Sequence, residues 1–318
     1  MTADEFSSLS DTLFSVSIVV YALAALAFAA LLAFGRQSQE SRREPAHVGA
    51  AAAGPADQVV ADSTGDRWGL VGVALTAVGL IAHAGVLIAR TAATGRVPWG
   101  NMYEFGTAAA LAGVVAYLLF AIRVPAVRRI GVFVLGVTAL GLVLIGLYLY
   151  AESGPLIAAL RSNWLAVHVS AAIIAFGIYI VSAVASALYL VAVRRDQAAS
   201  TAEESSGGLL SRLPDAQVLD RVAHRTAVFG FPVWTFAVIA GAIWAESAWG
   251  RFWGWDPKET WAFISWALYA AYLHARTTAG WRGRPAAWVN VVAFASLVFN
   301  LLFVNLVSTG LHSYGGVS

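Results

Sequence analysis

The sequence predicts an all-α fold, a polytopic membrane helix bundle of about eight transmembrane helices with both chain termini outside. Composition is the first observation, because 59% of the 318 residues are hydrophobic and only 12% are charged, which is too apolar for a soluble domain. The second is that the apolar residues gather in runs of about 20, the length that a helix needs to cross roughly 30 Å of hydrocarbon. The third is the placement of the arginines, which orients the bundle.

Eight apolar runs predict the helices, at 14–35, 69–90, 103–122, 130–150, 165–193, 225–246, 260–277 and 286–309. The first run lacks a small-residue cleavage pattern, so we interpret it as an uncleaved helix. Arginines follow the first, third, fifth and seventh runs, as Arg36, Arg42, Arg43, Arg67, Arg123, Arg128, Arg129, Arg194, Arg195, Arg276, Arg282 and Arg284. The positive-inside rule therefore puts these four connections in the cytoplasm.

Two of the cytoplasmic connections, 36–67 and 196–224, are long and of low complexity, which predicts linkers. We expect residues 1–68 to form the first transmembrane helix and its linker, and residues 69–318 to form a membrane domain with an external tryptophan-rich loop at 247–261. The chain has no cysteine, so any thiol chemistry belongs to a partner. The net charge is only +2 and the basic residues form no stripe, so we expect no nucleic acid partner.

The segment 249–261, which reads WGRFWGWDPKETW, is the most unusual part of the chain. An ordinary aromatic belt would explain tryptophans at a membrane interface, but it does not require four within 13 residues, namely Trp249, Trp253, Trp255 and Trp261. The density predicts a surface for a flat, apolar ligand. Arg251 and Lys258 are candidates to hold carboxylates of that ligand. Asp256 precedes Pro257, so it is either a helix N-cap or a ligand contact, and the sequence leaves both open.

Two histidines are predicted at the depth of this segment, His168 near the outer end of the fifth run and His312 after the eighth. Two imidazoles beside an aromatic surface predict a bis-histidine site for a planar metal cofactor, with iron held axially. The alternative is that each is hydrogen-bonded to a neighbour. His274, in the inner half of the seventh run, is predicted to be functional because ionisable groups inside membrane helices are costly. For His83 we favour a helix-to-helix hydrogen bond.

These motifs carry a family resemblance. The form WGWDPKETW within 249–261 resembles the tryptophan-rich WWD signature of the haem-handling proteins of cytochrome c biogenesis, in the CcsA/ResC (CcsB-type) branch. The segment 97–104 resembles the P-x-x-N-x-Y-E pattern of that branch, 164–169 its W-x-x-x-H-V pattern, and 310–314 its G-x-H-S-Y pattern. Arg96 departs from the family, since some members carry histidine in that context.

The resemblance implies that haem b is bound as cargo. It implies that His168 and His312 ligate the iron at an outer site and that His274 contributes to an inner site, whose second histidine belongs to a ResB/Ccs-type membrane subunit. Residues 69–318 would then be a haem-handling domain. Under this interpretation Trp249, Trp253, Trp255 and Trp261 contact the porphyrin, and Arg251 and Lys258 face its propionates.

The predicted function is that of a haem export and presentation subunit of the membrane cytochrome c synthase, a complex of the haem lyase type. It would lie in the plasma membrane with its site on the outer face and present haem to apocytochrome c bearing a CxxCH motif, with a thioredoxin-like thiol reductant as a further partner. No catalytic side chain is predicted on this chain, so its role is to position haem. The alternatives are a cytochrome b-like electron-transfer subunit and a membrane transporter.

Overall fold

The computed structural model describes residues 1–34, 63–154, 160–201, 212–308 and 310–312. Within these ranges the chain is helical and contains no strand, which confirms the all-α class. The elements in chain order are α1 (Ala3–Phe34), α2 (Ser63–Thr94), α3 (Met102–Arg123), the 3-10 helix η1 (Pro125–Ile130), α4 (Gly131–Tyr148), α5 (Asn163–Thr201), α6 (Ala216–Trp249), α7 (Pro257–Thr277) and α8 (Arg284–Leu306).

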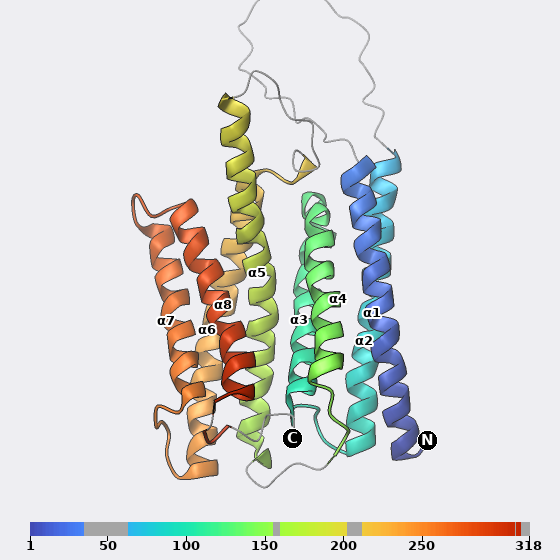
Figure 1. The fold of residues 1–318 in the computed structure, drawn as a ribbon, viewed down its shortest axis with the longest axis vertical. Coiled ribbons are helices and arrows are strands. Elements are labelled where there is room, and N and C mark those ends of the chain that lie inside the picture. The colour runs from blue at the N-terminus through green and yellow to red at the C-terminus, as the bar shows by residue number, and fades with distance from the viewer. Residues whose placement is uncertain (35–62, 155–159, 202–211, 309, 313–318) are drawn as a thin grey trace, which may run out of the picture.

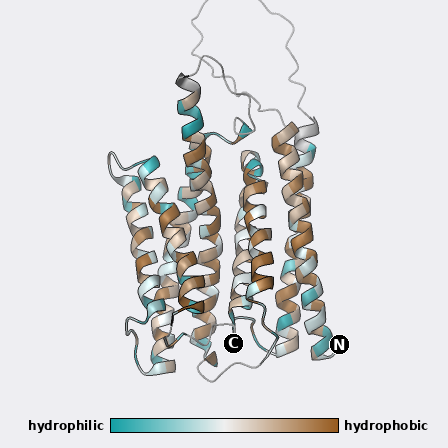
Figure 2. Ribbon diagram, in the orientation of Figure 1, coloured by the Kyte–Doolittle hydropathy of each residue, from teal (hydrophilic) through white to brown (hydrophobic). Residues whose placement is uncertain are grey.

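Among the described residues, seven segments, built from every helix except α7, are long and apolar enough to cross a bilayer, and the protein is a multi-pass membrane protein. Apolar residues dominate the middle of the bundle, and hydrophilic residues gather toward the helix ends (Figure 2). The helix α7 forms where the seventh run was predicted but is less apolar, because its first turn carries Lys258 and Glu259 and it buries Tyr269 and Tyr272.

The helices run alternately up and down along one axis (Figure 1). The start of α1, the end of α8 and the described parts of the connections α2–α3, α4–α5 and α6–α7 lie at one end of the bundle, and the connections α3–α4 and α7–α8 lie at the opposite end. We call the first of these the tryptophan end, because it contains the segment between α6 and α7. This alternation agrees with the arginine pattern, whereas the side of the membrane that each end faces remains a prediction.

Several predicted boundaries need correction. Part of the predicted linker 196–224 is helical, because α5 continues to Thr201 and α6 begins at Ala216. Leu219 and Val222 explain the early start of α6, since both are buried in the core. Residues 36–62 and 202–211 of the predicted linkers lie outside the described residues. The loop predicted at 247–261 is also shorter, since α6 ends at Trp249 and α7 begins at Pro257.

The contact between α3 and α5 connects the helices α1 to α4 with the helices α5 to α8. A Cβ atom added to Gly177 on α5 would lie against the backbone of Gly113 on α3, so the two helices touch at a pair of glycines. Lipid tails are as apolar as the helix surface, so the hydrophobic effect does not drive helices together inside a membrane. Close van der Waals packing holds them instead, and small residues allow it. This contact brings the first turns of α3 beside α5, where the candidate site lies.

Candidate functional site

A large cavity opens at the tryptophan end, between α3, α5, α6, α7 and α8. Its empty volume is about 1200 Å³, counted to include the open mouth. The lining is mainly apolar and aromatic, with a few polar side chains. It includes Trp99, Asn101, Met102, Phe105, Leu165, His168, Phe176, Trp234, Trp244, Trp249, Phe252, Trp253, Lys258, Glu259, Asn300, Asn305 and His312. Such a cavity suits a large, mostly apolar ligand with a small number of polar groups.

His168 lines the cavity from α5, and the adjacent helix α6 fixes its ring. Its Nδ1 lies 2.7 Å from the carbonyl oxygen of Ala237. Because a carbonyl oxygen only accepts, Nδ1 carries the proton and donates, which makes Nε2 the basic nitrogen. The ring stacks on Trp244 with 6.0 Å between ring centroids and 9° between planes. His168 therefore presents a defined tautomer and a defined ring plane.

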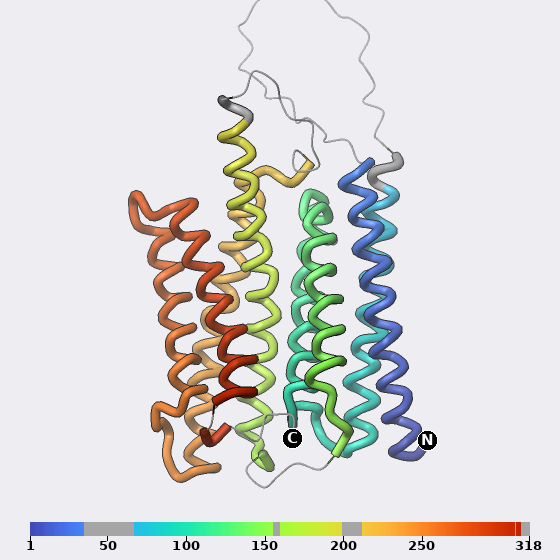
Figure 3. The backbone as a smooth tube through the Cα atoms, viewed as in Figure 1, coloured from blue at the N-terminus to red at the C-terminus, as the bar shows by residue number. Residues whose placement is uncertain are grey.

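His312 reaches the same cavity after the end of α8. Its Nδ1 lies 3.0 Å from Oδ1 of Asp256, and its ring meets the edges of Trp249 and Trp244 at centroid distances of 4.8 and 5.8 Å. Trp244 is thus a common neighbour of both histidines. Figure 3 shows the end of the described chain returning to the α6–α7 connection at this point. The structure therefore brings together the two histidines that the sequence predicted at one depth.

Asp256 has two structural roles, of which the N-cap confirms one of the two alternatives that the sequence left open, while contact with a ligand stays a prediction. It is the N-cap of α7 in a capping box, in which its Oδ1 accepts from the N–H of Lys258 at 2.9 Å and Glu259 accepts from the N–H of Asp256 at 3.1 Å. It also accepts from the N–H of Leu311 at 2.8 Å through Oδ2, next to its contact with His312. The helix cap is therefore also the residue that orients a histidine of the cavity.

The charge state of this pair follows from burial and hydrogen bonding. Burial raises the pKa of Asp256, but the hydrogen bonds from His312, Lys258 and Leu311 outweigh it and lower the pKa to about 2. Burial lowers the pKa of His312 below its ordinary 6.5, although the hydrogen bond to Asp256 acts in the opposite direction. At pH 7 the imidazole is therefore neutral and donates its Nδ1–H to an ionised carboxylate. A neutral imidazole oriented in this way is the form that ligates metals.

The two cations predicted for the site differ in position. Lys258 lines the cavity and donates from Nζ to Oδ1 of Asn305 at 2.6 Å. Asn305 in turn lies 2.9 Å from Sδ of Met102 through its Nδ2. Arg251 does not line the cavity and instead bonds Glu259 through Nη1 at 3.1 and 3.4 Å. The side chain of Lys258 is thus within reach of a ligand in the cavity, whereas Arg251 stabilises the segment 249–261 through its ion pair with Glu259.

The four predicted tryptophans separate into two pairs. Trp249 and Trp253 line the cavity. Trp255 is 64% exposed, has a left-handed φ of 58°, and lies outside the lining. Trp261 packs on Phe299 of α8, with 4.3 Å between ring centroids, and also lies outside it. Only half of the predicted aromatic surface therefore faces the cavity, and the rest faces outward or packs between helices.

His274 is not brought to the cavity. It is exposed in the last turn of α7, at the opposite end of the bundle. His83 is fully buried, and its Nδ1 lies 3.2 Å from the hydroxyl of Tyr21 on α1, which confirms the predicted helix-to-helix hydrogen bond.

Sequence reasoning missed several lining residues, above all Trp244, Trp99 and Asn305. Trp244 lies inside the apolar run before the signature, where a core position was the simplest expectation. Its spacing gave no signal, because the separation of five residues from Trp244 to Trp249 turns the two side chains about 140° apart on a helix. Trp99 belongs to the segment 97–104, which was noted as a motif without a role.

Fold and site together define a class: an α-helical, multi-pass membrane protein with an aromatic, histidine-bearing cavity at one end. Residues 99–312 match the family model described as cytochrome c assembly protein, a range that contains the cavity lining, and the chain belongs to that family. The remaining α1 and α2 precede this range.

The chain is similar to curated members in other organisms. It is 34% identical over 298 residues to the cytochrome c biogenesis protein CcsA of Gloeobacter violaceus, covering 78% of this chain and 87% of that protein. It is 40% identical over 174 residues to CcsA of Guillardia theta, covering 52% and 58%. Among solved structures, the cytochrome c haem lyase CcmF shares the fold with a TM-score of 0.63 at 16% identity, over 95% of this chain and 47% of that chain.

Proposed function

We propose that this chain is the haem export and presentation subunit of a membrane cytochrome c synthase, and that its cavity holds haem b on the outer face of the plasma membrane for attachment to apocytochrome c. The observation that carries the proposal is the pair His168 and His312. Both line one apolar cavity, both contact Trp244, and both have their Nδ1 hydrogen-bonded, which supports Nε2 as the nitrogen that would ligate iron. The names of the similar proteins, cytochrome c biogenesis protein and cytochrome c haem lyase, agree with this function.

In this proposal the cargo is held by its faces, edges and carboxylates. His168 and His312 ligate the iron, Trp249 and Trp253 pack against the porphyrin, and Lys258 pairs with a propionate. Asp256 orients His312. Trp255 and Trp261 would contribute through the shape of the segment, and Arg251 through its ion pair with Glu259.

The chemistry of attachment is shared with partners. Each new C–S bond joins a haem vinyl group to a thiol of the CxxCH motif, and the thiol proton goes to the other vinyl carbon. This chain has no cysteine, so the thiols belong to apocytochrome c, and a thioredoxin-like reductant keeps them reduced. What the chain contributes is a fixed haem with its reacting edge exposed at the cavity mouth.

The remaining partner is a ResB/Ccs-type membrane subunit. His274 is exposed on α7 at the opposite end of the bundle, and in this proposal the second ligand to haem at that level comes from another chain. We assign His274 to an inner haem site completed by that subunit.

The test is the visible spectrum of the purified chain, alone and with its partner subunit. We expect His168→Ala and His312→Ala each to insert normally and to lose the sharp ferrous bis-histidine bands. His274→Ala should keep those bands and lower the total haem content of the complex. Wild-type spectra from both outer-site variants would overturn the ligand assignment, and a wild-type chain that never takes up haem would overturn the proposed function.

A further inference from the structure

Two segments at the tryptophan end are built on the same plan. In 96–104, which reads RVPWGNMYE, an arginine precedes a glutamate by eight residues, and the N-cap of the next helix precedes that glutamate by three. In 251–259, which reads RFWGWDPKE, the arginine and the N-cap stand at the same two distances from the glutamate. Each segment also has a Trp-Gly pair between arginine and cap. We call them the first motif and the second motif.

The hydrogen bonds repeat along with the residues. In the first motif Glu104 accepts from both Nη atoms of Arg96, at 2.9 and 3.2 Å, and from the N–H of Gly100 at 2.6 Å, while Asn101 caps α3. In the second motif Glu259 accepts from Arg251 and from the N–H of Gly254 at 2.8 Å, while Asp256 caps α7. Each glutamate therefore ties a preceding loop to the first turn of its own helix.

Both motifs contribute to the wall of the one cavity. The first motif supplies Trp99, Gly100, Asn101 and Met102, and the second supplies Trp253, Lys258 and Glu259. Asn305 of α8 connects them, because it bonds Lys258 on one side and Met102 on the other. The indole Nε1 of Trp99 is buried and has no hydrogen-bond partner among the described residues. A ligand in the cavity would therefore meet a tryptophan from each motif.

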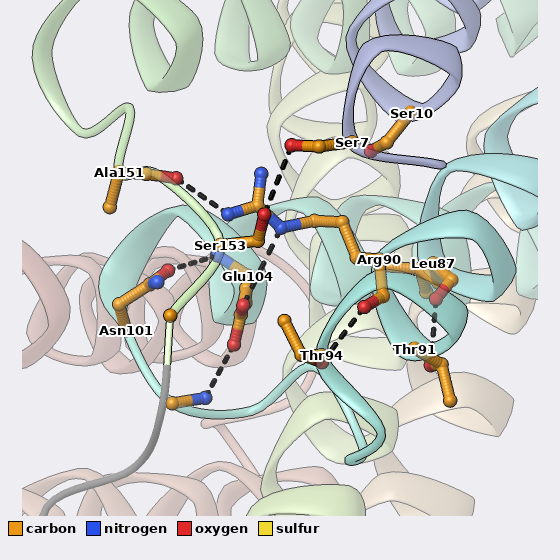
Figure 4. Close-up of polar contacts among 12 residues, drawn as sticks. Ser7, Ser10, Leu87, Arg90, Thr91, Thr94, Asn101, Glu104, Ala151 and Ser153 are labelled. Carbon is orange, nitrogen blue, oxygen red and sulfur yellow. Dashed lines mark hydrogen bonds and ion pairs between the residues drawn. The ribbon is translucent and has the colours of Figure 1, made fainter. Parts of the chain in front are cut away.

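The first motif has an additional anchor, Arg90 of α2. Its side chain is 1% exposed and lies with Nε 3.5 Å from Oε1 of Glu104, which is itself completely buried. Arg90 also donates to the carbonyl oxygen of Ala151 at 2.5 Å (Figure 4). Its guanidinium carbon lies over the ring of Tyr103, 4.6 Å from the ring centroid. Arg96 reaches the same connection through Gly154. The loop that carries Trp99 is thus held by two helices and the α4–α5 connection.

We propose that Trp99 binds the cargo as the counterpart of Trp253, and that Arg90, Arg96 and Glu104 are positioning residues that hold Trp99 at the cavity. The inference rests on the proposed function for the identity of the cargo, which is haem b. The loop between α2 and α3 is then the second half of a clamp whose first half is the tryptophan-rich segment. The hydrogen bonds and ion pairs of Arg90, Arg96 and Glu104 tie the loop to α2, α3 and the α4–α5 connection, so their effect is on how tightly the porphyrin is held.

The binding test is a titration of the purified full chain with haem b, followed by absorbance. Trp99→Ala and Trp253→Ala should each weaken binding about tenfold or more, the effect of removing a central tryptophan from a contact. The matched control is Trp281→Ala, because Trp281 is 54% exposed between α7 and α8 at the other end of the bundle. Wild-type affinity in Trp99→Ala, with weakened binding in Trp253→Ala, would overturn the role of Trp99 and leave the proposed function intact.

The positioning test has two readouts, and the first of them, the mobility of the loop, needs no haem. Because the chain has no cysteine, Val97→Cys gives a single nitroxide spin-label site on the loop, at a side chain that is 47% exposed. Arg96→Gln should increase the mobility of that label and weaken haem binding, and Arg96→Lys should restore part of both. Unchanged mobility and affinity in Arg96→Gln would overturn the positioning role. Failure of the wild-type chain to bind haem would instead count against the proposed function, since the mobility result does not depend on cargo.

Discussion

The two motifs of the tryptophan end share a plan but differ in burial and in their caps. In the first motif Arg96 and Glu104 are 14% and 0% exposed, and the additional anchor Arg90 is 1% exposed, whereas in the second motif Arg251 and Glu259 are 31% and 8% exposed. The first is capped by Asn101, which bonds the backbone of α3. The second is capped by Asp256, which also bonds His312. The same plan therefore anchors a loop in the first motif and orients His312, the proposed iron ligand, in the second.

The caps explain why the two uses cannot be exchanged. Asparagine and aspartate are nearly equal as N-caps, so α3 and α7 would begin equally well with either. With a neutral imidazole, however, a carboxylate forms a charge-assisted hydrogen bond and an amide oxygen does not, and a carboxylate also raises the basicity of a metal-bound imidazole. A carboxylate at position 101 would also stand next to Glu104 in a buried cluster, where like charges are costly. Asn101 therefore caps its helix, whereas Asp256 caps its helix and also orients His312.

The largest expected effect is on the free energy of unfolding, when the glutamate of each motif is replaced by glutamine. Glu104→Gln leaves two guanidinium groups without their counter-ion in a buried cluster and should cost about 3–5 kcal/mol of unfolding free energy. Glu259→Gln should cost clearly less, because Arg251 is partly exposed and solvent replaces its partner. Unfolding of the purified chains in mixed detergent micelles measures both. Equal losses of unfolding free energy in the two variants would mean that the deeper burial of the first motif does not make its ion pairs more important for stability.

A smaller effect is expected from exchanging the cap of the second motif. Asp256→Asn keeps an N-cap oxygen for α7 but removes the charge that orients His312, so stability should change little. Haem affinity should fall by about 10–100-fold, the usual cost of losing the partner of a metal-bound histidine. Comparing haem titration with unfolding of the same variant separates the two roles. A large loss of stability with unchanged haem affinity would show that Asp256 acts only as a cap.

Much of this comparison could be predicted from the sequence, but only one motif at a time. The aromatic density at Trp249 to Trp261 drew attention to the second motif, and the pattern of arginines placed His168 and His312 at one end. The cap of α7 was predictable from Asp256 and Pro257, because capping is a local interaction. The first motif was noted only as a pattern, since a single tryptophan among ordinary residues gives no local signal of a cavity.

What the sequence did not reveal depends on which helices pack together. Arg90 and Glu104 lie on different helices, and their pairing follows from the packing of α2 on α3. Trp255 and Trp261 are as aromatic as Trp249 and Trp253, yet the left-handed turn at Trp255 and the direction of α7 point them elsewhere. Asn305 of α8 connects the two motifs, because it bonds Lys258, which is 47 residues away in the sequence, and Met102, which is 203 residues away. Spacing along one chain does not encode such contacts.

The smallest expected effect is a change of stability with pH. It comes from His312, which is hydrogen-bonded to Asp256 of the second motif. Burial places the pKa of His312 below 6.5, so between pH 6.5 and that lower value the unfolded chain binds more protons than the folded one. The corresponding stability is present in full above pH 6.5 and falls as the pH falls.

The groups facing His312 set the size of this effect: Asp256 and Glu259 favour its protonation, and Lys258 opposes it. The haem-free wild-type chain should therefore lose stability between pH 7.5 and 5 by more than His312→Gln does, since glutamine does not titrate. Unfolding of both chains across this range measures the difference. Parallel curves would mean that His312 keeps its ordinary pKa, and that Asp256 compensates fully for the burial of the ring.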